Sequence, residues 1–217
     1  MSTFGQWKRQ ALAKRFGLTE KKSHPDLLLW VNSHTEVGEL ATRNLLRLLR
    51  QTSDKFWDFN EWELALKVIA KIIQEVNFDG NTIRSFSLRD MRATIDNEEL
   101  NGKPDWVVAT GSQDPEKPYF FLQEHKKSFD NEGDPIGQCL VAMLVAQTLN
   151  QEPNEILYGS FVVGADWYFM ILKGKEYSIS LPYSITREDD ILQIYQILKI
   201  LKIRLFTMLG EELEDEE

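Results

Sequence analysis

Three ionisable side chains have a spacing that could hold a divalent cation. Asp105 opens the short apolar segment DWVVA, and Glu124 and Lys126 lie near the end of a second one, YFFLQEHKK. Alternate side chains of a strand share a face, so Glu124 and Lys126 project to the same side. Neighbouring carboxylates repel each other unless a proton or a cation lies between them, and their oxygens suit Mg²⁺ or Mn²⁺. These residues therefore indicate a Mg²⁺ (or Mn²⁺) site beside a lysine.

The two segments are expected to pair as an antiparallel hairpin. They are joined by residues 110–118, TGSQDPEKP, which are rich in turn formers. With Ala109 opposite Phe120, the register puts Asp105 opposite Glu124, at a separation of roughly 5 Å. The two acids and the lysine then converge at one end of the hairpin.

On this register, alternate side chains of the second segment point away from the acids. His125 and Lys127 are therefore expected to be surface groups rather than catalysts. We interpret several aromatic side chains on predicted core elements as packing residues rather than as platforms for base stacking. These are Trp62, Trp106, Phe120, Phe121, Trp167 and Phe169.

The elements around the hairpin follow from hydrophobic periodicity. Residues 60–76 predict a helix with Asn60 as its cap, and 82–95 hold a first strand. Asn101-Gly102 predicts a tight turn before Asp105. The later elements are expected as a helix over 134–149, strands over 156–163, 167–172 and 177–181, and a long helix over 188–208. This order of helix, three strands, helix and strand predicts an α/β fold.

The chain is expected to divide into three parts. Residues 1–57 predict a helical extension packed on the core, with helices over 4–16 and 37–49 that are interrupted by His24-Pro25. Residues 58–209 form the main domain. Residues 210–217 predict an acidic, disordered tail.

Composition limits the possible partners. The chain has 217 residues and a net charge of −9, but six acids of the tail account for six of these charges, so the rest is near −3. A nearly neutral body can still bind phosphate through a local basic groove. The candidate cations around the first strand and the motif are Arg84, Arg89, Arg92, Lys103, Lys126 and Lys127.

The sequence is typical of a cytoplasmic protein. The single cysteine, Cys139, cannot form an intrachain disulfide. The amino terminus has no apolar stretch of signal-peptide length, and no run approaches the 18 or so apolar residues that a membrane span needs. We therefore expect a cytoplasmic location and no membrane partner.

The motif resembles that of a known nuclease superfamily. Pro104-Asp105, an interval of eighteen residues, and Glu124-His125-Lys126 are similar to the PD-(D/E)xK signature. The similarity extends over about residues 60–163. It implies a restriction-endonuclease-like core, made of a helix, a three-stranded antiparallel meander, a helix and a strand, with a helical amino-terminal extension and a long carboxy-terminal helix.

The resemblance also implies roles for the motif residues. Asp105, Glu124 and the backbone carbonyl of His125 would bind the metal. Lys126 would orient or activate the attacking water and offset the developing phosphate charge.

Two further residues are implied by position. Many members of the superfamily add an acid from the first core helix to the catalytic and metal-binding residues, and here Glu61 is chosen, with Glu63 close behind. A glutamine often follows on the next helix, and Gln138 matches it. Glu61 could instead serve the helix dipole, although the site role is favoured, and Gln138 could equally be an ordinary polar residue at a helix start. The tyrosine of exonuclease-like branches is absent, because residue 142 is alanine.

The function implied is hydrolysis of phosphodiester bonds, in DNA more than in RNA. Many members of the superfamily act as homodimers, so a homodimer is one possible assembly of this chain. The alternative is a catalytically idle module that keeps the fold for binding or assembly. A hydrolase of small phosphate esters is a third reading, and a surface ion-pair ladder would be a purely structural one.

Overall fold

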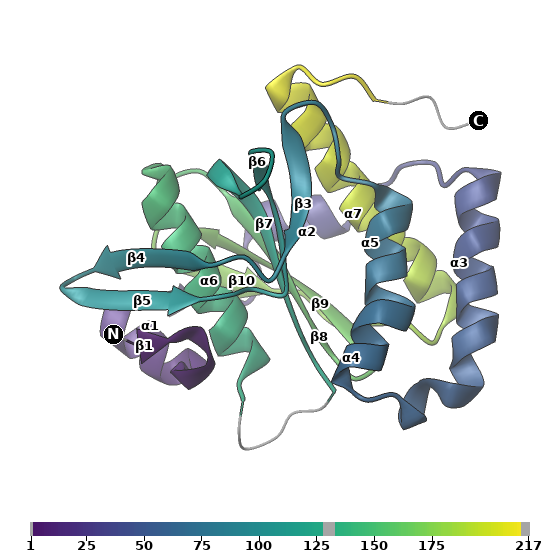
Figure 1. Cartoon of the computed structure of the whole chain (residues 1–217), viewed down its shortest axis with the longest axis horizontal. Helices are drawn as coiled ribbons and strands as arrows, with labels where there is room; N and C mark the ends of the chain where they lie inside the picture. The colour runs from purple at the N-terminus through teal and green to yellow at the C-terminus, as the bar shows by residue number, and fades with distance from the viewer. Residues whose placement is uncertain (1, 128–132, 214–217) are drawn as a thin grey trace.

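A mixed sheet runs through the centre of the molecule, and the chain is an α/β protein (Figure 1). The computed structural model describes residues 2–127 and 133–213. In these residues the strands of the main sheet are β2 (Thr19–Glu20), β10 (Glu176–Ile179), β9 (Asp166–Lys173), β8 (Leu157–Val163), β7 (Glu116–Lys126), β6 (Trp106–Thr110) and β3 (Ile83–Ser87), in that spatial order, with β11 (Tyr183–Ser184) beside β9. Strands β7 and β8 are parallel, as are β2 and β10, and the other pairs are antiparallel.

Helices cover both faces of this sheet. Val107 and Leu122 belong to the apolar core on the side of α6 (Pro135–Asn150), whereas Val108 and Phe121 belong to the core on the side of α7 (Glu188–Leu209). Figure 1 shows α6 on one side and α5, α7 and α3 on the other. The central strand β7 is therefore buried on both faces, and its polar end lies inside a three-layered structure.

The helix before the sheet forms where it was predicted, and Asn60 is its cap. It comprises α4 (Glu61–Leu64), a π-helical turn η3 (Ala65–Ile69) and α5 (Ala70–Val76). Asn60 Oδ1 accepts a hydrogen bond from Glu63 N at 2.9 Å, and Glu63 Oε2 accepts one from Asn60 N at 3.1 Å, which forms a capping box. The helix ends at Asn77 in the left-handed region, at a φ of 51°. This cap fixes Glu61 in the first turn.

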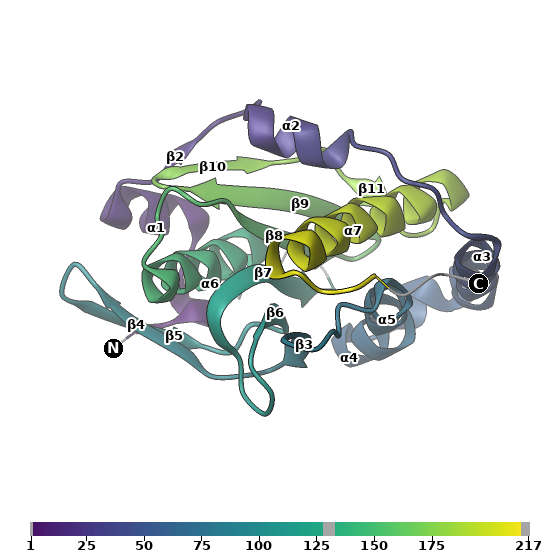
Figure 2. The same ribbon diagram turned by 90° about the horizontal axis from the view of Figure 1, so that it is seen from above.

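The predicted turn at Asn101-Gly102 was wrong. Both residues lie in β5 (Glu98–Gly102), which pairs with β4 (Met91–Ile95) and β1 (Ser2–Thr3) in a second sheet. The turn is at Asp96 and Asn97, whose φ angles of 48° and 63° suit a two-residue hairpin. Gly102 is instead required by close packing, because a Cβ there would lie 2.2 Å from the Phe4 ring. Figure 2 shows this hairpin beside α6.

Residues 2–58 are mostly helical, and they also contribute β1 and β2 to the two sheets. Their helices are η1 (Phe4–Gln6), α1 (Arg9–Phe16), α2 (Pro25–Val31), α3 (Glu39–Thr52) and η2 (Ser53–Asp58). His24-Pro25 was expected only to interrupt helices, whereas it begins α2. Proline suits the first helical turn, and His24 Nδ1 accepts a hydrogen bond from Asp26 N at 3.2 Å.

The start of the acidic tail is attached to the body. Glu211 accepts hydrogen bonds from Asn81 N at 2.9 Å and from Thr82 N and Oγ1, each at 2.6 Å. The predicted disorder therefore does not apply to Glu211, and residues 214–217 lie outside the described part. In the part that the structure describes, none of the helices has the length and apolar character that crossing a membrane requires.

The first turn of α6 is packed tightly against the amino-terminal extension. Its cap Asp134 accepts hydrogen bonds from Ile136 N and Gly137 N, each at 3.1 Å, and from Arg9 N at 2.6 Å. A Cβ on Gly137 would lie 2.3 Å from Trp7 O. The extension therefore fixes the start of α6 against the sheet.

We predict that Gly137→Ala lowers the free energy of unfolding by roughly 1–3 kcal/mol, because the new methyl group overlaps backbone atoms. Urea denaturation followed by tryptophan fluorescence measures this change. Gly5→Ala is the matched control: its Cβ has its nearest neighbour at 3.9 Å, so it should cause no loss of stability. Equal unfolding midpoints for the two variants would contradict this packing.

Candidate active site

The hairpin of β6 and β7 brings Asp105 beside Glu124. Val108 pairs with Phe121 and Trp106 pairs with Gln123, which is the predicted register. Continuing this register by one residue places Asp105 next to Glu124. The predicted pair of Ala109 and Phe120 was wrong, because a β-bulge after Val108 makes Tyr119 the partner of Ala109. The bulge lies at the far end of the hairpin and leaves the two acids together.

Glu124 is a buried carboxylate, with 5% of its surface exposed. Burial raises its pKa well above the ordinary value of 4.5, and the adjacent negative charge of Asp105 raises it further. Burial raises the pKa of the Cys139 thiol, and the negative charge of Glu124 raises it further. Cys139 lies on α6, and its Sγ is 3.7 Å from Leu122 O. A proton or a cation is therefore needed to stabilise this position.

Asp105 is held by His125. Its Oδ2 accepts a hydrogen bond from His125 N at 2.8 Å and lies 2.9 Å from His125 Nδ1, although the orientation of that second contact is not that of a hydrogen bond. Burial raises the pKa of Asp105, but the contacts with the His125 side chain and with its backbone N–H outweigh burial and lower it. Asp105 is therefore the ionised partner of the pair.

His125 was predicted to be a surface group, and this was wrong. Its exposed fraction is only 6%. The prediction assumed that the second face of the strand meets solvent, whereas β7 lies between β6 and β8 and has helices on both faces. The prediction for Lys127 is confirmed, because this residue follows β7 and is exposed.

Lys126, at the end of β7, forms an ion pair with Glu61 of α4. The distance from Lys126 Nζ to Glu61 Oε1 is 2.9 Å. Burial lowers the pKa of Lys126, but Glu61, Asp105 and Glu124 outweigh burial and raise it, so the side chain is an ammonium ion at neutral pH. The first core helix thus contributes an acid to the cluster.

Glu63 has a different role from Glu61. Its carboxylate completes the capping box at Asn60 and lies 2.6 Å from Lys67 Nζ. The hydrogen bonds from Lys67 and from Asn60 N lower the pKa of Glu63. Of the two candidates in the sequence, the structure therefore brings Glu61 to the motif.

Gln138 is buried in the first turn of α6, with an exposed fraction of 8%. Its side-chain nitrogen lies beside Gly5, and within the described residues it forms no hydrogen bond with Asp105, Glu124 or Lys126. Its role at the site stays a prediction.

The oxygen donors at the cluster have the chemistry that a hard divalent cation requires. Across residues 2–127 and 133–213, no three His, Cys, Asp or Glu side chains are grouped to hold a metal ion as they stand, and Glu61 is engaged with Lys126. Asp105 and Glu124 nevertheless fit such a cation, because Glu124 is buried beside a second acid. The carbonyl of His125 as a ligand stays a prediction.

The predicted basic approach is largely neutralised by ion pairs. Arg89 lies 3.4 Å from Asp114, Arg92 lies 3.5 Å from Glu99, and Lys103 lies 3.2 Å from Asp90. Arg84 donates to Ser112 O at 3.3 Å. The sequence identified cations but not the acids that the hairpins place beside them.

Most of the aromatic side chains pack as predicted. Phe120, Phe121, Trp167 and Phe169 are buried and Trp106 is partly buried. Trp62 was wrongly interpreted as a core residue, because 62% of it is exposed, as is 74% of Trp57. Trp62 follows Glu61 in the first turn, where the core-facing position is taken by Leu64.

The fold makes the chain an α/β protein. Its candidate site gathers two acids, a lysine and a further acid from the preceding helix at the end of a central strand. No protein-family model matches the sequence, and no curated protein matches it.

We predict that Glu124→Gln stabilises the protein at neutral pH when a chelator is present. The folded-state pKa of Glu124 is raised, so its contribution to stability is complete below 4.5 and is lost as pH rises through the folded-state pKa. The free energy of unfolding of the wild type should therefore fall with rising pH in this window, and the variant should lack that component.

Chemical denaturation at several pH values measures this effect. Glu212→Gln is the control, because Glu212 is exposed and its variant should keep the wild-type pH profile. A Glu124→Gln protein less stable than the wild type at neutral pH would show that the carboxylate is compensated in the folded chain.

Proposed function

We propose that this chain is a metal-dependent nuclease, built on a restriction-endonuclease-like core, that hydrolyses phosphodiester bonds in DNA with Mg²⁺ or Mn²⁺. The arrangement of elements supports this core. Strands β3, β6 and β7 are antiparallel neighbours that follow the helix of α4 and α5, and β8 lies parallel to β7 after α6. The hairpin of β4 and β5 is an insertion between β3 and β6.

The main support for the proposal is that four ionisable side chains from three parts of the fold lie close together. Asp105 and Glu124 lie side by side, Lys126 shares the face of Glu124, and Glu61 reaches Lys126 from α4. A structural role does not require a buried carboxylate beside a second one, since such a pair costs free energy. A cation bound between the two carboxylates would offset that cost.

The residues divide the chemistry between them. Asp105 and Glu124 would hold the cation, which when bound supplies positive charge for the phosphate and for the attacking water. Lys126 is protonated, so it acts as a hydrogen-bond donor that orients water and offsets phosphate charge rather than as a base. Glu61 positions the Lys126 ammonium group.

We predict metal-dependent cleavage by the wild type and its loss, by roughly 10²–10³-fold, in Asp105→Ala and Lys126→Ala, since each removes an electrostatic group at the reacting phosphate. Cleavage is measured with Mg²⁺ and with Mn²⁺ on linear duplex, single-stranded and supercoiled DNA and on RNA. Lys175→Ala is the control: it removes an exposed lysine in the turn between β9 and β10, outside the cluster, and should keep the wild-type rate. Equal background in all of these proteins would contradict the proposal.

We predict that Glu61→Gln lowers the cleavage rate at saturating DNA by about tenfold or more, because the variant removes the charge that positions Lys126. Glu63→Gln changes the same residue type two positions away and should keep nearly the full rate. Single-turnover cleavage separates this effect from binding. The opposite ranking of the two variants would assign the helix acid to Glu63.

A catalytically idle binding or assembly module is the second candidate. It is favoured by the contacts that engage two of the acids, since Asp105 is bound by His125 N and Glu61 by Lys126. Thermal unfolding with Mn²⁺ separates the two candidates. An active site should give stabilisation that depends on Asp105, and an idle module should give none.

A further inference from the structure

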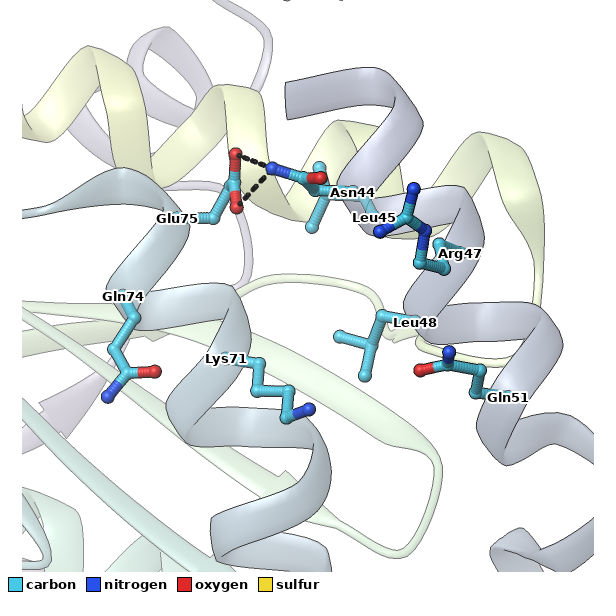
Figure 3. Close-up of a pocket in the computed structure, with 8 residues that line it drawn as sticks. All are labelled: Asn44, Leu45, Arg47, Leu48, Gln51, Lys71, Gln74 and Glu75. Atoms are coloured by element: carbon cyan, nitrogen blue, oxygen red, sulfur yellow. Dashed lines mark hydrogen bonds between the residues drawn. The ribbon is translucent and has the colours of Figure 1, made fainter. Parts of the chain in front are cut away.

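A cleft between α3 and α5 gathers polar and cationic side chains away from the site described above. Its polar lining consists of Asn44, Arg47 and Gln51 from α3 and Lys71, Gln74 and Glu75 from α5. Figure 3 shows Lys71 and Gln51 extending toward each other from the two helices. The one acid in this set is engaged, because both Glu75 oxygens accept hydrogen bonds from Asn44 Nδ2, at 3.2 and 3.3 Å.

The cleft lies beside a row of arginines on α3. Arg43, Arg47 and Arg50 are exposed, at spacings of four and three residues that place them on one side of the helix. The other side of α3, including Leu45 and Leu48, is buried. Folding therefore uses the apolar side of α3 and leaves its guanidinium groups in solvent.

These three arginines differ from all others in the part of the chain that the structure describes. The guanidinium groups of Arg43, Arg47 and Arg50 form no ion pair or hydrogen bond there, and neither does the Lys71 ammonium group. The remaining arginines each have a partner: Arg9, Arg15, Arg84, Arg89, Arg92, Arg187 and Arg204.

Overall charge makes this arrangement informative. The chain has 34 acids and 25 lysines and arginines, so carboxylates are in excess. Within residues 2–127 and 133–213, four cations that form no ion pair nevertheless gather at one surface, where Glu75 is the acid of the cleft lining. Guanidinium groups bind phosphate by paired, planar hydrogen bonds, and amide side chains such as Gln51 and Gln74 can donate to phosphate oxygens as well.

The cleft is placed within reach of a polymer held at the active site. Lys71 follows Glu61 by ten residues in the same helix, which corresponds to about 15 Å along its axis. Successive phosphates of a DNA strand are about 3.4 Å apart along the duplex axis, so this distance corresponds to about four base pairs.

We propose that the cleft of α3 and α5, with the arginine row, binds the phosphate backbone of duplex DNA about four base pairs from the bond that is cut. The position of that bond rests on the proposed nuclease function. The binding itself does not, because it needs only the cations of this surface. An acidic protein would be the competing occupant.

Binding is measured by fluorescence anisotropy with a labelled duplex of about 20 base pairs, in chelator and over a range of salt concentrations. Arg47→Ala/Lys71→Ala should weaken binding by about tenfold or more and lower the slope of log affinity against log salt by about 2, because two phosphate contacts are lost. Lys14→Ala/Lys175→Ala removes two other exposed cations and should keep the wild-type slope. Lys14 lies in α1, at the opposite end of the molecule from α3 (Figure 1).

The outcomes separate this inference from the nuclease proposal. Equal slopes and affinities for the two double variants would overturn it, as would absence of duplex binding by the wild type. Weakened binding in Arg47→Ala/Lys71→Ala supports the surface even if the wild type cuts no DNA. Binding retained by Asp105→Ala supports it further, because that variant removes the cleavage site alone.

Discussion

A buried carboxylate beside a second carboxylate is the constraint around which the structure is organised. Removing a charged group from water is costly unless it is paired, protonated or bound to a cation. Glu124 lies on the central strand, which has a neighbouring strand on each side and helices over both faces. Asp105 lies next to it. The two acids have different surroundings, since Asp105 is hydrogen-bonded to His125 N and Glu124 has little access to water. Their pKa values are thereby driven apart, because burial and Asp105 raise that of Glu124 while the contacts with His125 lower that of Asp105.

The rest of the site depends on the helix that begins at Asn60. A capping box fixes the start of α4, and the first turn then directs Glu61 to Lys126 while Glu63 remains with the cap. The same contact joins the helix to the sheet at the point where the motif lies. Because Lys126 stays protonated among three acids, the cluster keeps a hydrogen-bond donor together with its carboxylates.

Charge outside the site is distributed by the way the helices pack. The cations near β3, β4 and β6 are largely paired with acids of the same or a neighbouring hairpin, so they present little net positive charge. In the part of the chain that the structure describes, the arginines of α3 form no ion pair, and the neighbouring α5 presents Lys71 together with a Glu75 that is hydrogen-bonded to Asn44. An acidic chain can in this way retain one surface of the opposite sign.

The sequence by itself determined the local features of the fold. The alternation in YFFLQEHKK placed Glu124 and Lys126 on one face, the pairing of 106–108 with 121–123 followed from hairpin geometry, and Asn60 marked a helix start. Each of these depends on side-chain period or backbone geometry over a few residues. The tertiary structure alone decided the burial of His125, the hairpin turn at Asp96-Asn97, the contact of Glu61 with Lys126 and, within the described residues, the absence of ion pairs at the arginines of α3. These features depend on which strand or helix lies opposite each side chain, and that is set by packing between segments far apart in the chain.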